Sequence, residues 1–181
     1  AEGLELVRAH GRLAAPFAEA HPAYVTLECA ARTDPTDELL EVLGECEAVR
    51  DATVASDAAG VAKLWAYRET HTEAISAAGV PVKLDVSVPL RELTGLVADL
   101  PGTVAAAAPG ARVLIFGHLG EGNLHVNVLD ASEHAERVSD AVLRLVAERR
   151  GSISSEHGVG RAKARWLTLT RAATEIAAMR R

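Results

Sequence analysis

Two short segments of this chain combine histidine and glycine residues at spacings that could bind a metal ion. In the first, GHLGEGNLH, six residues separate His118 from His125, and Gly120 and Gly122 are among them. Glycine tolerates the positive φ angles of a tight reversal, so we expect the two imidazoles to lie side by side where two strands meet. Two histidines and a carboxylate are a common ligand set for Zn²⁺ and similar divalent ions.

The second segment, SSEHGVGR, places Glu156 directly before His157 and two glycines. Adjacent residues of a regular strand point to opposite faces, so both side chains reach one site only if the backbone leaves strand geometry there. Glu156, or Glu121 of the first segment, would then complete a metal site beside a free imidazole that could act as a general base. The alternatives are structural: a hairpin with surface histidines, and a carboxylate near a helix N-terminus, where anions are favoured.

The hydrophobic pattern predicts the elements that must position these residues. Apolar alternation and dense apolar runs predict strands at 24–30, 53–56, 81–88, 112–116, 123–129 and 152–155. Helical spacing predicts helices at 2–20, 35–46, 57–76 and 90–100, one from the capping residue Asp130 to Gly151, and one from about 161 to the end. The direct connection between 112–116 and 123–129 requires an antiparallel pair. We therefore predict an α+β fold with a mostly antiparallel or mixed sheet and helices packed on one face.

Composition excludes several classes of function. The chain has 181 residues, which predicts a single domain over 1–181, and its net charge of -6 argues against a nucleic-acid binder. No apolar run is long enough to predict a membrane span, and the first residues do not resemble a signal peptide. Cys29 and Cys46 form no CxxC pair, and we expect both to fill the core of a cytoplasmic protein.

The motifs GHLGEGNLH and SSEHGVGRAK together resemble the C-terminal domain of FAD-linked oxidases of the vanillyl-alcohol-oxidase type. This group contains D-lactate, glycolate and D-2-hydroxyglutarate dehydrogenases. VKLDVSVPL and WAYRETHT are similar to further blocks of the family, and the likeness extends from about residue 24 to the end. The family's loop usually reads H-x-G-D-G-N-x-H, so Glu121 stands here where Asp is usual. The resemblance implies a ferredoxin-like cap domain that binds substrate.

The resemblance also implies a role for each residue that matches a family motif. His118, His125 and Glu156 would bind the metal, His157 would be the catalytic base, and Asn127 would contact the substrate. Arg68, Thr72 and Lys83 match positions that hold substrate carboxylates in the 2-hydroxyglutarate members. The spacing of Arg68 and Thr72 agrees with this role, because residues four apart lie on one helix face and a guanidinium group suits a carboxylate. The alternative is solvated surface, which is the usual place for Arg and Lys.

The function implied is that of the substrate- and metal-binding domain of an FAD-dependent D-2-hydroxy-acid dehydrogenase. It would oxidise the 2-hydroxyl of D-2-hydroxyglutarate, D-lactate or glycolate to a keto group, with hydride transfer to flavin and with Zn²⁺ or Mn²⁺ as the metal. The chain contains neither G-x-G-x-x-G nor GxxxxGK[ST]. We therefore expect FAD to be bound mainly by an N-terminal domain of the same parent chain that is absent here, and the isolated domain to be inactive.

The partners expected from the resemblance are a small 2-hydroxy acid, the FAD-binding domain and a second copy in a homodimer. Two alternatives remain from the residues alone. One is a metal-dependent hydrolase, in which Glu121 or Glu156 activates water, and the other is a non-catalytic module that binds small anions.

Overall fold

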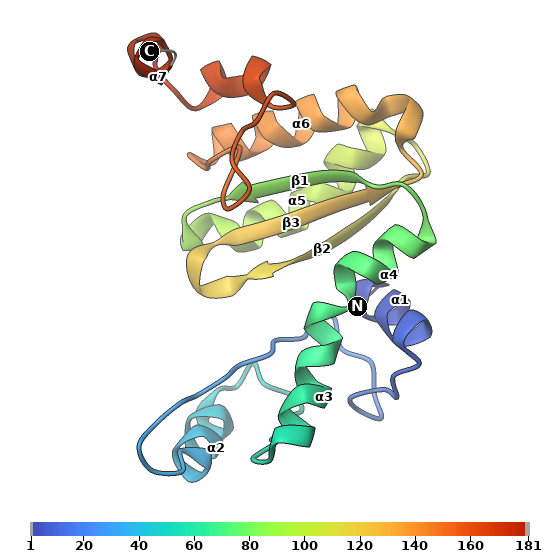
Figure 1. The fold of residues 1–181 in the computed structure, drawn as a ribbon, viewed down its shortest axis with the longest axis vertical. Helices are drawn as coiled ribbons and strands as arrows, with labels where there is room; N and C mark the ends of the chain where they lie inside the picture. The colour runs from blue at the N-terminus through green and yellow to red at the C-terminus, as the bar shows by residue number, and fades with distance from the viewer. Residues whose placement is uncertain (1, 180–181) are drawn as a thin grey trace. The chain divides into compact units, whose positions relative to one another are not determined.

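A computed structural model describes residues 2–179 and divides the chain into two compact units, residues 1–74 and 75–181 (Figure 1). The first unit contains α1 (Glu2–Gly11), α2 (Thr36–Glu45) and α3 (Ala58–Glu69). Helix α4 (His71–Ala78) crosses the boundary between the units. The predicted cap of α3 is confirmed, because Asp57 Oδ1 accepts a hydrogen bond from the backbone nitrogen of Gly60 at 2.7 Å.

The second unit is built on a three-stranded antiparallel sheet. Its strands are β1 (Val82–Ser87), β2 (Arg112–His118) and β3 (Asn123–Leu129), in the order β1-β3-β2. The predicted antiparallel hairpin of 112–116 and 123–129 is therefore confirmed, and so is the α+β class. The sheet brings β1 beside β3, although the two strands are separated in sequence by a helix and by β2.

Helices α5 (Leu90–Ala107) and α6 (Ala135–Glu148) cover one face of this sheet. Apolar residues that alternate along β1 and β3 face these helices and form the core with them. Leu84, Val86, Leu124, Val126 and Val128 are the sheet residues of that core. The residues between them, including Lys83, Asp85, His125 and Asn127, therefore lie on the opposite face of the sheet.

Several element boundaries in the second unit differ from the prediction. Helix α5 continues through Pro101 to Ala107, because Leu100, Val104 and Ala107 extend its buried stripe. Asp130 has a φ of 60° and does not cap α6, which instead follows a short 3₁₀ turn. The strand expected at 152–155 is reduced to one bridge, between Ser87 and Ser152. The final helix is divided into the 3₁₀ helix η3 (Ala164–Leu169) and α7 (Ala173–Met179).

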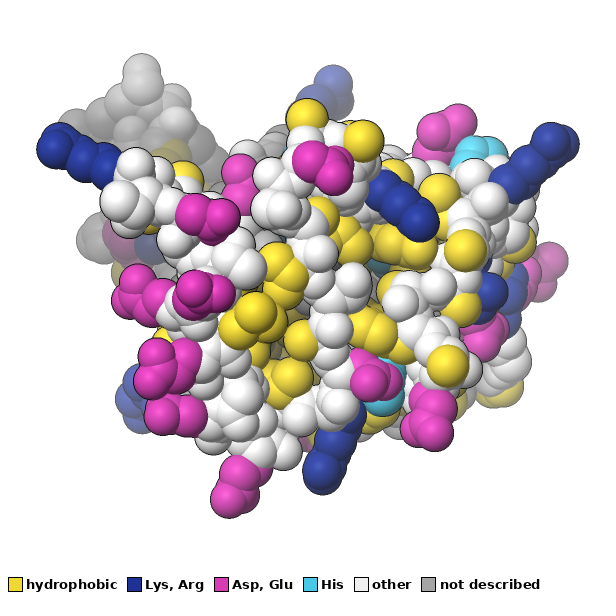
Figure 2. Space-filling view, turned by 90° about the horizontal axis from the view of Figure 1, so that it is seen from below, with side chains coloured by type: hydrophobic (Ala, Val, Ile, Leu, Met, Phe, Trp, Pro, Cys, Tyr) yellow, Lys and Arg dark blue, Asp and Glu magenta, His cyan; other side chains and the backbone are white. Residues whose placement is uncertain are grey.

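The strands predicted at 24–30 and 53–56 are wrong: both segments lack strand structure. Val25 and Leu27 are 67% and 57% exposed, so the alternation has no neighbouring strand to pair with in the described chain. Cys29 and Cys46 are exposed rather than buried, as are Leu40 and other apolar residues of the first unit. Figure 2 shows apolar side chains gathered in the middle of one face of the molecule, with acidic side chains along one side.

The helix predicted at 57–76 is interrupted at Thr70, so α3 and α4 are separate helices. None of the helices in residues 2–179 combines the length and the apolar character needed to cross a membrane.

Candidate active site

The β2–β3 hairpin places two of the predicted metal ligands beside each other. His118 is the last residue of β2, His125 lies in β3, and their ring centroids are 5.7 Å apart. Of the two glycines expected to adopt positive φ, Gly122 does so at 65°, whereas Gly120 does not. A Cβ atom on Gly122 would lie 2.1 Å from the carbonyl oxygen of Val88, so the close backbone approach also requires glycine.

Glu156 is a carboxylate that approaches both histidines. Its Oε1 is 2.6 Å from Nδ1 of His118 and its Oε2 is 4.0 Å from Nε2 of His125. Donor atoms of these three residues all lie within 4.8 Å of one another, a spacing that fits a divalent ion. Glu121 also approaches His118, with its Oε2 3.9 Å from Nδ1, but 75% of its side chain is exposed.

Asn123 orients the carboxylate of Glu156. This fully buried side chain donates from Nδ2 to Oε1 of Glu156 at 2.6 Å. Desolvation opposes ionisation of Glu156, but the hydrogen bond from Asn123 and the nearby His118 outweigh it and lower the pKa of Glu156. The carboxylate is therefore held in its charged form, which is the form that binds metals.

A tight turn presents Glu156 and His157 on the same side of the backbone. Oδ2 of Asp85 accepts hydrogen bonds from the backbone nitrogens of Ser155, Glu156 and His157, at 2.9, 2.9 and 3.0 Å. The backbone therefore curls around one carboxylate oxygen and leaves strand geometry, as the two adjacent side chains require. The His157 ring centroid lies 5.7 Å from that of His125, so the exposed imidazole of His157 borders the cluster of His118, His125 and Glu156.

Asp85 is nearly buried, and its environment keeps it ionised. Desolvation would raise its pKa, but the N–H groups of His157, Ser155 and Glu156 and the charge of Lys163 together lower the pKa of Asp85 below its ordinary value.

Lys163 joins the turn to strand β1. Its Nζ donates to the carbonyl oxygens of Asp85 and Ile153, at 2.6 and 2.7 Å. Burial lowers the pKa of Lys163, and attraction to Asp85 partly opposes that change. The side chain therefore connects the two segments at the base of the site.

The strand register places further predicted site residues in rows across the face of the sheet opposite α5 and α6. Lys83 of β1 is paired with Asn127 of β3, and Asp85 is paired with His125. His125 is in turn paired with Phe116 of β2, whose ring centroid is 5.0 Å from the imidazole. Lys83 Nζ donates to Oγ of Ser76 at 3.4 Å. Lys83 and Asn127 thus lie one row along the sheet from His125 of that cluster.

Arg68 and Thr72 belong to the first unit, whereas the residues above belong to the second. Arg68 lies in α3 and Thr72 in α4, so they are in successive helices rather than on one continuous helix. Their participation in a common site with Lys83 stays a prediction.

Sequence reasoning missed three residues that support this site: Asp85, Asn123 and Lys163. A signal for Asp85 is present in the sequence, because it lies in the middle of a strand between Leu84 and Val86. An acid in that position must find hydrogen-bond donors if it is buried. Asn123 and Lys163 lie within the motifs GHLGEGNLH and SSEHGVGRAK, but their residue types do not reveal their partners, which are distant in sequence.

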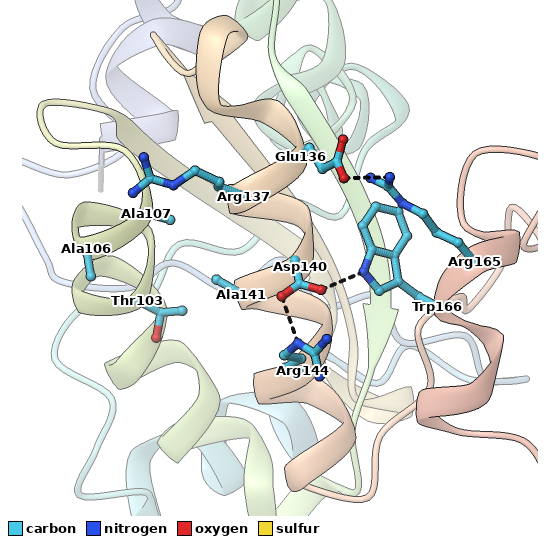
Figure 3. Close-up of a pocket in the computed structure, with 10 residues that line it drawn as sticks. All are labelled: Thr103, Ala106, Ala107, Glu136, Arg137, Asp140, Ala141, Arg144, Arg165 and Trp166. Carbon is cyan, nitrogen blue, oxygen red and sulfur yellow. Dashed lines mark hydrogen bonds and ion pairs between the residues drawn. The ribbon is translucent and has the colours of Figure 1, made fainter.

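A hollow of about 920 Å³ lies elsewhere, among α5, α6 and η3 (Figure 3). Four of its charged groups are paired: Asp140 accepts from Arg144 at 2.7 Å and from Trp166 at 3.0 Å, and Arg165 pairs with Glu136 at 2.6 Å. The hydrogen bonds from Arg144 and Trp166 lower the pKa of Asp140. The hollow is formed by the helices that cover the other face of the sheet, so it is separate from the histidine cluster.

Comparison with known proteins gives the family of this chain. The family model described as FAD linked oxidases, C-terminal domain, matches residues 1–181. A D-2-hydroxyglutarate dehydrogenase of Xanthomonas citri pv. viticola is 42% identical over 98% of this chain and 40% of its own length. The mitochondrial D-2-hydroxyglutarate dehydrogenase of Bos taurus is 38% identical over 88% of this chain and 30% of its own length.

A third relative, the D-2-hydroxyglutarate dehydrogenase of Stutzerimonas stutzeri, is 32% identical over 99% of this chain and 41% of its own length. The chain therefore spans less than half the length of these relatives. Because the family model covers the chain from end to end, this protein belongs to the family of FAD-linked oxidase C-terminal domains.

Proposed function

We propose that this chain is the substrate- and metal-binding domain of an FAD-dependent D-2-hydroxy-acid dehydrogenase. The observation that carries the proposal is the convergence of His118, His125 and Glu156, with donor atoms within 4.8 Å, beside the imidazole of His157. The names of the relatives favour D-2-hydroxyglutarate as the substrate. Lys83 supports a dicarboxylate, because its exposed cationic side chain lies on the same sheet face as the cluster.

The donor set fits a divalent ion of the Zn²⁺ or Mn²⁺ type, because it combines two imidazoles with a carboxylate. His118, His125 and Glu156 would hold it, and when bound it would make a coordinated hydroxyl group more acidic. Asn123 would support the site, because its hydrogen bond fixes the carboxylate of Glu156.

Other residues of the chain would accept the substrate proton and bind the substrate. His157 would accept the proton of the 2-hydroxyl group on a ring nitrogen. Asn127 and Lys83 would bind and orient the substrate, with Lys83 attracting the distal carboxylate. Arg68 and Thr72 would contribute further carboxylate contacts.

FAD, held mainly by a separate domain, would supply the acceptor for the hydride that leaves C2. Loss of one proton and one hydride converts the alcohol to the ketone, so the two electrons and both hydrogens are accounted for.

The metal site is tested by metal analysis of the purified chain without chelators. We expect the unsubstituted chain to retain about one equivalent of a divalent ion, and His118→Ala to lose most of it, because one of three ligands is removed. His134→Ala, at the start of α6, is the matched control and should retain the ion. An unsubstituted chain that binds no divalent ion would contradict the metal site.

The reaction is tested with the chain joined to its flavin domain. We expect D-2-hydroxyglutarate to bleach the visible absorbance of FAD under anaerobic conditions, and His157→Asn to slow this reduction by at least about 100-fold. D-lactate and glycolate form the comparison panel. If no 2-hydroxy acid bleaches the flavin, the dehydrogenase assignment is wrong; hydrolysis of an ester panel would instead favour a metal hydrolase.

A further inference from the structure

The second oxygen of Asp85 is buried without a hydrogen-bond partner in the described part of the chain. Three backbone N–H groups occupy Oδ2, whereas Oδ1 is inaccessible to solvent and unpaired. Asp85 as a whole is only 7% exposed. Leaving a buried carboxylate oxygen without a donor is costly, so a donor is expected close by.

His125 offers that donor. Its Nδ1 lies 3.6 Å from Oδ1 of Asp85, slightly longer than a hydrogen bond, and the two residues are paired across β1 and β3. The other ring nitrogen, Nε2, lies on the side of Glu156, 4.0 Å from its Oε2. The imidazole therefore bridges the two carboxylates, with one nitrogen directed to each.

A neutral imidazole carries one proton, so the partner of one nitrogen decides the state of the other. If Nδ1 donates to Asp85, Nε2 is left with a lone pair facing Glu156 and His118. Metal-bound histidines commonly donate their second nitrogen to a carboxylate in this way, which fixes the ring and its tautomer.

We propose that Asp85 is a positioning residue for the metal site: its Oδ1 fixes the Nδ1–H tautomer of His125, while its Oδ2 holds the turn that carries Glu156 and His157. One carboxylate thus aligns two metal ligands and the proposed base, which come from β3 and from a loop about thirty residues further along the chain. The metal-dependent part of this inference rests on the proposed function; the pairing of Asp85 with His125 does not.

The competing arrangement makes Asp85 itself a ligand. Donor atoms of Asp85, His125 and His157 also lie within 4.8 Å of one another. That arrangement needs a lone pair on Nδ1 of His125, and therefore the opposite tautomer, with the proton on Nε2. It also requires Asp85, whose carboxylate already accepts three N–H bonds, to bind an ion. The tautomer of His125 separates the two arrangements.

The first experiment needs no substitution. Long-range ¹H–¹⁵N NMR of the metal-free chain, at a pH where the imidazole is neutral, assigns the proton to one ring nitrogen. We expect His125 in the Nδ1–H form. A predominant Nε2–H form would overturn the proposal, whether or not the chain binds a metal.

The second experiment measures Zn²⁺ affinity by competition with a chromophoric chelator. Asp85→Asn keeps the size of the side chain but presents an amide, whose NH₂ group would donate to Nδ1 and leave the proton on Nε2. We expect about 10- to 100-fold weaker Zn²⁺ binding, and a change of the His125 signal to the Nε2–H form. Asp130→Asn is the control with the same charge change at the other end of the sheet, where Asp130 pairs with Arg112, and should alter the affinity less than twofold.

The outcomes distinguish the two proposals. A folded Asp85→Asn variant that keeps the original tautomer and affinity contradicts the positioning role. If the unsubstituted chain binds no Zn²⁺ but His125 is in the Nδ1–H form, the metal site of the proposed function fails while the Asp85–His125 pairing stands. If Asp85→Asn does not fold, the tautomer of the unsubstituted chain still decides.

Discussion

Nδ2 of Asn123 lies 2.6 Å from Oε1 of Glu156, the same oxygen that lies 2.6 Å from Nδ1 of His118. One carboxylate oxygen is therefore held by a buried amide and by a predicted metal ligand at the same time. The amide comes from the first residue of β3, so the position of Glu156 depends on the hairpin as well as on its own loop.

Asn123→Ala should weaken both the metal site and the fold. Without the amide, Glu156 loses its fixed orientation, and we expect several-fold weaker Zn²⁺ binding in the chelator assay. Removing a buried hydrogen-bonded group should also lower the free energy of unfolding by about 1 to 3 kcal/mol. Asn127→Ala, on the same strand and face, should leave Zn²⁺ affinity within twofold. Equal losses of Zn²⁺ affinity in the two variants would argue against a specific role for Asn123.

Gly122→Ala should disturb the hairpin that carries the two histidines. The new Cβ would lie 2.1 Å from the carbonyl oxygen of Val88, and a φ of 65° is unfavourable for alanine. We expect denaturant unfolding to show a loss of about 1 to 3 kcal/mol in the free energy of unfolding. Gly120→Ala is the matched control, because its added methyl group would have no heavy atom within 4 Å, and it should change stability little.

Lys83→Ala should affect substrates according to their charge. If Lys83 attracts a distal carboxylate, kcat/KM of the flavin-containing enzyme for D-2-hydroxyglutarate should fall roughly 10- to 100-fold, as expected for loss of a charged hydrogen bond. D-lactate, which has no second carboxylate, should be affected much less. Lys63→Ala, an exposed lysine of α3, is the control. Equal losses on the two substrates would exclude the distal-carboxylate role.

Asp140 should make stability depend on pH at the acidic end. The hydrogen bonds from Arg144 and Trp166 lower its folded-state pKa below the ordinary value of 3.8. The contribution of Asp140 to the free energy of unfolding is therefore complete at pH values well above 3.8. It is lost as the pH falls through 3.8 towards the lower folded-state pKa. Asp140→Asn should reduce the free energy of unfolding at pH 7, and the difference from the unsubstituted chain should shrink below about pH 4. Glu133→Gln, which removes the charge of an exposed acid, is the control variant.

The sheet and the two histidines could be predicted because their signals are local. Alternation along 82–88 and 123–129 reports directly which side chains face the core, and a short glycine-containing connection between 112–116 and 123–129 permits only an antiparallel pair. Val25 and Leu27 show the limit of the same signal. Their alternation is as regular, but a strand also needs a neighbour, and the pattern of one segment carries no information about that.

The support of the site could not be predicted for a related reason. Asp85 acts on backbone groups 70 to 72 residues further along the chain, and Lys163 reaches back 78 residues to the carbonyl oxygen of Asp85. Backbone N–H groups are the same in every residue type except proline, so a carboxylate that binds them leaves no complementary residue for a motif to reveal. The residue types and spacing of the histidines and Glu156 indicate their chemistry. The type and position of Asp85, which aligns them, do not indicate its role.

Core residues and site residues alternate strictly along β1, so the alignment of the site depends on the same strand register as the core. If β1 slipped by one residue against β3, Leu84 or Val86 would take the place of Asp85 opposite His125. The same slip would turn Lys83 and Asp85 toward α5 and α6 and expose two core residues to water. A chain with a misaligned site would therefore also be an unstable chain, so protein quality control would remove the inactive form along with the misfolded one.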